Sequence, residues 1–225
     1  MEENQSKEVI EEVKQPLPNV SSKFLSKENY PLLLVLGIAI VIQLYFLIKT
    51  FNQPLWWDEA VYLLKSKAIA FGTPDVGVNR GRALFNSFLW AGLFKIGLTE
   101  HFFRILQTIF SFVIVGLTYK IAHMITKNKF IAFFAGFSLT VCWVLSYATT
   151  RFFPDVTGLL LWMTMIFLFW KGYVEESKVI PKYFYWIAPV FVIASYAREM
   201  NLMFVGIIFI YMFAKEKFSL FKINE

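Results

Sequence analysis

Two adjacent carboxylates follow the first long apolar run of the chain. The run Trp56-Trp57-Asp58-Glu59-Ala60 places two tryptophans directly before them. Trp rings favour the headgroup layer of a bilayer, because the ring buries its body there and keeps its polar edge wet. A charge at that depth is costly unless it is solvated or used. We therefore predict that Asp58 is the centre of an active site at a membrane interface.

The composition indicates the class of protein that positions this site. Of the 225 residues, 57% are hydrophobic and 19% aromatic, while only 17% are charged. This is too apolar for an ordinary soluble domain, so we predict an all-α integral membrane protein. The net charge of +6 does not indicate nucleic acid, because the basic residues lie mainly in short segments between apolar runs. The only cysteine, Cys142, excludes an intrachain disulfide and a thiolate metal cluster.

About six apolar runs predict the transmembrane helices, at a rise of about 1.5 Å per helical residue. The first covers 31–48 and is polar only at Gln43; the next three cover 101–125, a run that ends at about 148, and 155–170. Residues 183–214 are predicted to form two short spans that meet at a polar elbow around Arg198. The membrane module is thus expected over 31–214, between a disordered cytoplasmic tail at 1–30 and a basic cytoplasmic end at 215–225.

A long loop over residues 49–100 joins the first two spans, and its length predicts a function. Residues 59–71 are expected to form a helix that begins with Asp58 as its N-cap and stops at Gly72. A second helix is expected over 83–96, ending at Gly97. Both segments mix polar and apolar residues, as is typical of amphipathic helices that lie in the membrane interface.

The basic residues predict the orientation. They gather near the tail, at 127 and 129, over 171–182 and after 214. The positive-inside rule then places both termini in the cytoplasm and the long loop outside. Long loops translocate regardless of charge, so basic residues in this loop, such as Arg80 and Arg82, could serve an anionic ligand. We predict a multi-pass protein of the plasma membrane.

Three short runs resemble one protein family. They are the Asp58-Glu59 pair, the run from Phe94 to Arg104 that enters the second span, and the run from Arg151 to Asp155 that enters the fourth. In order and spacing they are similar to the N-terminal module of C-type integral-membrane glycosyltransferases, such as protein O-mannosyltransferases and the aminoarabinose transferases of lipid A. The resemblance covers about residues 31–214.

The resemblance implies a reaction. A sugar would move from a polyprenyl-phosphate donor in the bilayer to a hydroxyl of a protein or glycolipid acceptor on the outer face, with inversion at the anomeric carbon. Asp58 matches the essential first-loop acid of the family, and Asp155 matches its second acid. Because the family usually continues with further spans, we expect this chain to be part of a longer enzyme. It could be inactive alone, with a partner chain supplying the missing spans.

The implied chemistry assigns roles to individual residues. An acceptor hydroxyl needs a general base within hydrogen-bonding reach, and Asp58 is our candidate. Glu59 would point about 100° away on a helix, so we expect it to orient the loop or bind the acceptor. The lipid phosphate is already a good leaving group, so the site needs cations to hold it rather than an acid. The candidate substrate-binding residues are Tyr62, Arg80, Arg82, Arg151 and Arg198. No metal ligands are predicted, although a divalent cation stays open as a cofactor.

Each assignment has a simpler alternative. Asp58 could be only a helix N-cap, and Asp155 could be only a first-turn carboxylate that the helix dipole favours. The four arginines could be solvated loop charges or could extend to lipid headgroups. The alternative for the whole chain is a non-catalytic polyprenyl-lipid-binding subunit, or one half of a carrier. A carrier would show paired repeats with broken helices, whereas only one broken stretch is visible, near Arg198.

Overall fold

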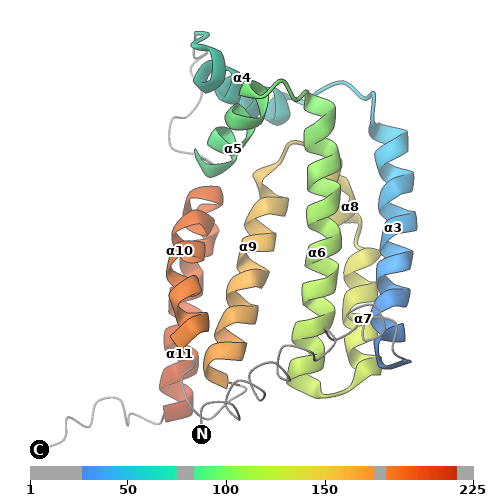
Figure 1. Cartoon of the computed structure of the whole chain (residues 1–225), viewed down its shortest axis with the longest axis vertical. Coiled ribbons are helices and arrows are strands. Elements are labelled where there is room, and N and C mark those ends of the chain that lie inside the picture. The colour runs from blue at the N-terminus through green and yellow to red at the C-terminus, as the bar shows by residue number, and fades with distance from the viewer. Residues whose placement is uncertain (1–26, 75–83, 175–180, 217–225) are drawn as a thin grey trace, which may run out of the picture.

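The computed structural model describes residues 27–74, 84–174 and 181–216. Within these ranges all regular structure is helical, and most of the helices stand side by side as a bundle (Figure 1). The predicted all-α membrane class is confirmed. The tail at 1–26, the basic end after 216, and both Arg80 and Arg82 lie outside the described residues.

Three helices are long and apolar enough to cross a membrane. They are α3 (Tyr30–Thr50), α6 (Glu100–Thr126) and α9 (Pro154–Phe169), the last continued by a π-helical turn to Val174. Pro31 and Pro154 lie in first turns, where the missing backbone N–H has no helical partner to lose. Each helix lies within a few residues of its predicted range.

The third predicted span is not one straight helix. Helix α7 (Lys129–Thr140) and helix α8 (Trp143–Thr149) are bent by 56° at Val141 and Cys142. The bend presents α8 to the buried amide of Gln43 in α3. That amide donates to Ser146 Oγ at 3.2 Å and accepts from Thr149 Oγ1 at 2.8 Å. An amide without partners is costly among apolar helices, so these bonds give a physical reason for the bend.

The last apolar stretch folds as two shorter helices, as predicted. Helix α10 (Pro181–Ala197) and helix α11 (Met203–Glu216) meet at a 3-10 turn, η3 (Glu199–Leu202). Asn201 ties this elbow to the bundle, because its amide donates to Ala194 O at 2.8 Å and to Gly158 O of α9 at 3.3 Å. With 17 and 14 residues, α10 and α11 are shorter than the three long helices. Six crossings therefore stay a prediction.

Helices α4 (Trp57–Phe71) and α5 (Leu84–Lys95) lie across one end of the bundle, which we call the capped end (Figure 1). Gly72 ends α4 in the left-handed conformation, at φ 70°, as predicted. The prediction that Asp58 is the N-cap is wrong. Trp56 is the N-cap, and its N–H donates to the Glu59 carboxylate at 2.6 Å, so the helix begins earlier and Asp58 lies in its first turn.

The two capping helices are fixed by an aromatic cluster. Leu63 of α4 and Trp90 and Phe94 of α5 are buried with Phe103 of α6 and Phe152. The Phe103 ring contacts the rings of Phe94 and Trp90, with centroid distances of 4.9 and 6.0 Å. Because this cluster joins α4 and α5 to the top of α6, the loop between the first two spans has a packed core of its own.

Candidate functional site

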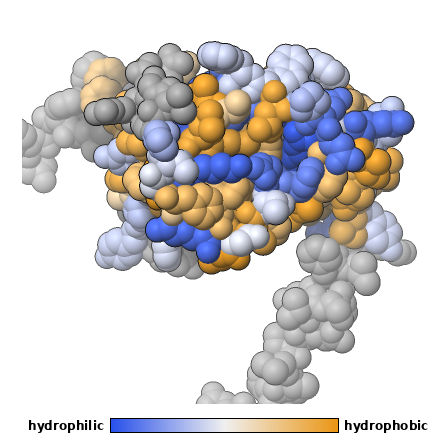
Figure 2. All heavy atoms as spheres, turned by 90° about the horizontal axis from the view of Figure 1, so that it is seen from above, coloured by the Kyte–Doolittle hydropathy of each residue, from blue (hydrophilic) through white to orange (hydrophobic). Residues whose placement is uncertain are grey.

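Charged and aromatic residues gather at the capped end. Seen onto this end, a band of hydrophilic residues runs between hydrophobic ones (Figure 2). Two pairs of oppositely charged side chains lie at this end, the buried pair of Glu59 with Arg151 and the half-exposed pair of Asp155 with Arg198. The sequence proposed all four residues as site residues, and the structure brings them together in these two pairs.

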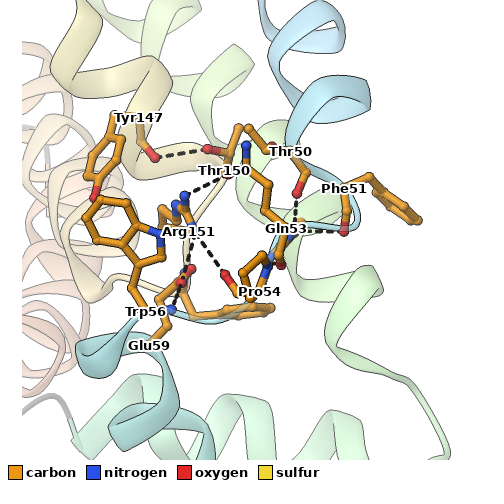
Figure 3. A network of polar contacts seen from close by, with 11 residues as sticks. Thr50, Phe51, Gln53, Pro54, Trp56, Glu59, Tyr147, Thr150 and Arg151 are labelled. Atoms are coloured by element: carbon orange, nitrogen blue, oxygen red, sulfur yellow. Dashed lines mark hydrogen bonds and ion pairs between the residues drawn. The ribbon is translucent and has the colours of Figure 1, made fainter.

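Glu59 is fully buried, and both of its carboxylate oxygens have partners (Figure 3). Oε2 accepts from the Trp56 N–H at 2.6 Å and from Arg151 Nη1 at 3.2 Å. Oε1 accepts from the Phe152 N–H at 3.1 Å. Glu59 therefore joins the start of α4 to the turn between α8 and α9. A buried charge is tolerated because it is paired and hydrogen-bonded on each side.

Arg151 lies at the centre of the network in Figure 3 and is only 5% exposed. Besides Glu59, it donates to Gln53 Oε1 at 2.7 Å and to Pro54 O at 3.3 Å. Its guanidinium lies over the Trp56 ring at 4.7 Å from the centroid, a cation–π contact. The fork geometry of arginine suits this task, because one planar group reaches several acceptors at once.

Arg104 is a third buried charge, and the sequence interpretation assigned it no role. Its guanidinium donates to the carbonyls of Thr50, Phe51 and Gln53, at 2.7 Å for Phe51 and 3.0 Å for Gln53. These carbonyls lie at and just beyond the C-terminal end of α3, where a cation also meets the negative end of the helix dipole. An arginine inside an otherwise apolar span is itself a sign of function, and that sign could have identified Arg104.

Asp58 differs from the neighbouring Glu59 in exposure and in hydrogen bonding. Its side chain is exposed, and it has no hydrogen bond or ion pair with the residues that the structure describes. Glu59, one position on, faces into the protein. The helical turn thus separates the two carboxylates into one that is buried and paired and one that is open to solvent.

Asp155 and Arg198 form a half-exposed pair at the mouth of a cavity. Asp155 lies in the first turn of α9, as predicted, and its Oδ1 accepts from Arg198 Nη2 at 2.6 Å, with side chains 45% and 43% exposed. The cavity measures about 530 Å³ and is otherwise mainly apolar; its lining residues also include Gly158, Leu159, Trp162, Met200, Asn201, Met203 and Ile207. A charged mouth over an apolar wall suits an amphipathic ligand.

The remaining candidates are more scattered. Tyr62 is half-buried beside the aromatic cluster, where its ring meets Trp90 edge-on at 6.4 Å. Asp58 does not line the cavity of Asp155 and Arg198. Within the described part of the chain, no three His, Cys, Asp or Glu side chains gather in a way that could hold a metal ion.

An all-helical bundle with a charged, aromatic site under two capping helices defines a multi-pass membrane protein with its candidate site at one end. The chain belongs to the dolichyl-phosphate-mannose-protein mannosyltransferase family, whose model matches residues 82–223. It is therefore a membrane glycosyltransferase of the C type, and the resemblance seen in the sequence is confirmed. Arg151, Asp155 and Arg198 lie within the matched residues, whereas Asp58 and Glu59 precede them. No curated protein and no solved structure matches the chain.

Proposed function

We propose that this chain transfers a sugar from a polyprenyl-phosphate donor to an acceptor hydroxyl, with Asp58 as the general base. The observation that carries the proposal is the contrast between Asp58 and Glu59. A base must be able to take a proton from an incoming substrate. Asp58 is exposed and has no partner among the described residues, whereas both oxygens of Glu59 are occupied.

The proposed reaction is a single nucleophilic displacement at the anomeric carbon. Asp58 takes the proton of the acceptor hydroxyl while that oxygen attacks the anomeric carbon. The bond between this carbon and the phosphate oxygen breaks, and the polyprenyl phosphate leaves with the electron pair. Attack from the face opposite the leaving group inverts the anomeric configuration.

Arg198 is the described residue best placed to hold the phosphate. Its guanidinium is half-exposed at the mouth of an amphipathic cavity and has one acidic partner, Asp155. In the proposal Asp155 positions Arg198, and the apolar cavity wall receives the first isoprene units of the donor. Arg80 and Arg82, outside the described residues, are proposed as further phosphate ligands, and Tyr62 is proposed to bind substrate.

Glu59 and Arg151 act as positioning residues in this proposal. Three hydrogen bonds of Arg151 go to protein groups, one of them to Glu59, and the pair holds the first turn of α4. Asp58 belongs to that turn, so the buried pair fixes the direction of the base. This use of Glu59 agrees with the expectation that it orients the loop.

We also propose that the capped end faces outward from the plasma membrane. The start of α3 and the end of α11 both lie opposite the capped end (Figure 1). The basic segments around Lys127 and Lys171 lie on that opposite side, which the positive-inside rule places in the cytoplasm. The acceptor, a protein or a glycolipid, would then be modified outside the cell.

The test is sugar transfer from a labelled polyprenyl-phosphate donor in native membranes. We expect Asp58→Asn to lower the transfer rate at least about a hundredfold, because general-base catalysis contributes that much or more. Glu100→Gln is the matched control, since Glu100 is a carboxylate of the same end that is paired with Lys67 at 2.6 Å. Full transfer by Asp58→Asn would refute the proposed base. A chain that binds donor without transfer in native membranes would instead be the non-catalytic lipid-binding subunit.

A further inference from the structure

A second hollow opens at the capped end between the end of α3 and helix α8. Its volume is about 700 Å³, and it shares no lining residue with the cavity of Asp155 and Arg198. One wall carries Tyr45, Lys49 and Gln53, and the other carries Trp143, Tyr147 and Arg151. We call this hollow the α3–α8 groove. The transfer reaction proposed above does not use it.

The head of the α3–α8 groove is positively charged. Lys49 is exposed in the last turn of α3, and Arg151 forms part of the lining. Among the described lining residues there is no carboxylate. Behind the lining, Glu59 is paired with Arg151, and the same carboxylate interacts electrostatically with the buried guanidinium of Arg104. The excess positive charge at this position favours an anionic ligand.

Each wall carries an exposed aromatic ring on the same side of its cation, while Trp56 and Tyr147 lie beside Arg151 at the head of the groove. On α3, Tyr45 lies one turn deeper in the bundle than Lys49, about 6 Å along the helix. On the other wall, Trp143 starts α8 and Arg151 follows its end. Trp143 and Tyr45 are 65% and 58% exposed, so these rings are open to a ligand. The groove therefore offers a cationic end and an end with exposed aromatic rings, which suits a ligand with an anionic head and an apolar chain.

We propose that the α3–α8 groove binds one anionic phospholipid. The phosphate lies beside Lys49 and Gln53, and the upper part of the acyl chains lies against Tyr45 and Trp143. Basic residues close to a membrane surface attract anionic headgroups, and a pocket between helices makes that attraction specific. The bound lipid stabilises residues 50–54, the segment that leads from α3 into α4.

The first test is native mass spectrometry of the full chain titrated with phosphatidylglycerol or phosphatidylcholine of the same acyl chains. We expect one phosphatidylglycerol to be retained at concentrations where phosphatidylcholine is not. Lys49→Gln should weaken that binding about fivefold, since it removes one basic residue near the headgroup. Lys95→Gln, which removes an exposed lysine of the same end that does not line the groove, should leave it unchanged. Equal retention of both lipids, or equal loss in both variants, would overturn the proposal.

The second test locates the bound lipid through tryptophan fluorescence. Phosphatidylglycerol brominated near the top of its acyl chains should quench more emission than brominated phosphatidylcholine. Trp143→Phe should abolish most of that difference, while Trp186→Phe should preserve it. Trp186 is a matched control because it is 64% exposed, nearly the same as Trp143, but lies on α10. A difference that survives Trp143→Phe would place the lipid elsewhere.

A third experiment tests whether the groove binds the phospholipid or the polyprenyl lipid of the sugar donor. Unlabelled polyprenyl phosphate should not displace the retained phosphatidylglycerol, because the groove and the Asp155–Arg198 cavity are separate. Displacement at equal concentrations would show that the groove holds the polyprenyl lipid, and would overturn a separate phospholipid site. This outcome is independent of whether Asp58 acts as the base.

Discussion

The two carboxylate–guanidinium pairs of the capped end have the same chemistry and opposite surroundings. Glu59 and Arg151 are buried, with side chains 0% and 5% exposed, and further hydrogen bonds surround them. Asp155 and Arg198 are closer together, at 2.6 Å against 3.2 Å, yet nearly half of each side chain is exposed. The shorter distance does not mark the stronger contribution, because water screens an exposed pair.

The comparison indicates that the two ion pairs have different roles in the site. The buried pair lies between α4 and the turn before α9, so it determines where the first turn of α4 points. The exposed pair lies at a cavity mouth, where a ligand can reach it. We expect the first to act mainly on stability and the second mainly on substrate affinity. Four substitutions test this division, from the largest effect on stability to the smallest.

Glu59→Gln should lower the free energy of unfolding more than the other three substitutions. The amide nearly preserves the shape of the side chain but leaves the Arg151 charge buried without its counterion, which costs about 3 kcal/mol or more. The free energy of unfolding in detergent is the measurement. Restored stability in the double variant Glu59→Gln, Arg151→Met would show that the lone buried charge is the cause. A single variant as stable as the unmodified chain would refute the structural role.

Arg104→Lys should cause the second-largest loss in the free energy of unfolding. Lysine keeps the charge but cannot reach three carbonyls with one planar group, so we expect a loss of about 2 kcal/mol in the free energy of unfolding. The ends of α3 and α4 should also become more accessible to hydrogen exchange. Lys120→Arg, a charge-preserving change at an exposed position in the same helix, serves as the control. Equal exchange in both variants would contradict the role of Arg104 at the end of α3.

Gly158→Ala should destabilise the close packing of α9 against Arg198, the basic residue of the exposed pair. A Cβ at this position would lie 2.9 Å from Arg198 Cβ, so the elbow must shift, at a cost of about 1 to 2 kcal/mol. The shift should also weaken donor binding. Gly37→Ala is the matched control, because its added Cβ would meet no atom within 4 Å beyond the neighbouring backbone of its own helix, and it should be neutral or stabilising. Unchanged stability and donor affinity would mean that the contact relaxes without moving Arg198.

Asp155→Asn should have the smallest effect on stability, within about 1 kcal/mol, since the pair is half-exposed. Donor affinity should nevertheless change several-fold, because Arg198 loses the partner that holds it. Equilibrium binding of a polyprenyl-phosphate analogue measures this. A destabilisation as large as that of Glu59→Gln would remove the distinction between the two pairs.

Apolar run length was enough to predict most of the fold. The ranges of α3, α6 and α9 followed from hydrophobic length, and the stop of α4 followed from Gly72. The elbow before α11 followed from the polar residues that interrupt an apolar stretch at Arg198. The bend between α7 and α8 did not, because it depends on a hydrogen bond to Gln43, whose partners are more than 100 positions away. Local patterns carry no information about such a contact.

The candidate site, like the fold, could be predicted from the sequence only in part. The sequence identified the residues of both ion pairs, because charges beside apolar runs are few and conspicuous. It could not pair them, and it treated Asp58 as the N-cap that Trp56 turned out to be. Burial also had to come from the tertiary structure, since neighbouring Asp58 and Glu59 have the same chemistry and opposite exposure. Arg104 could have been identified as a charge within a predicted span, but its partners could not, because backbone carbonyls have no signature in a sequence.

The bond of Gln43 to helix α8 has a consequence for biosynthesis. Ser146 and Thr149 follow Gln43 by 103 and 106 residues, which a ribosome adds in roughly 5 to 20 seconds. During that interval α3 has been synthesised but its amide still lacks the two hydroxyls that later satisfy it. Until α8 is present, any hydrogen bonds of this amide must come from other groups. Synthesis of α8 then supplies the two hydroxyls that Gln43 bonds in the folded bundle.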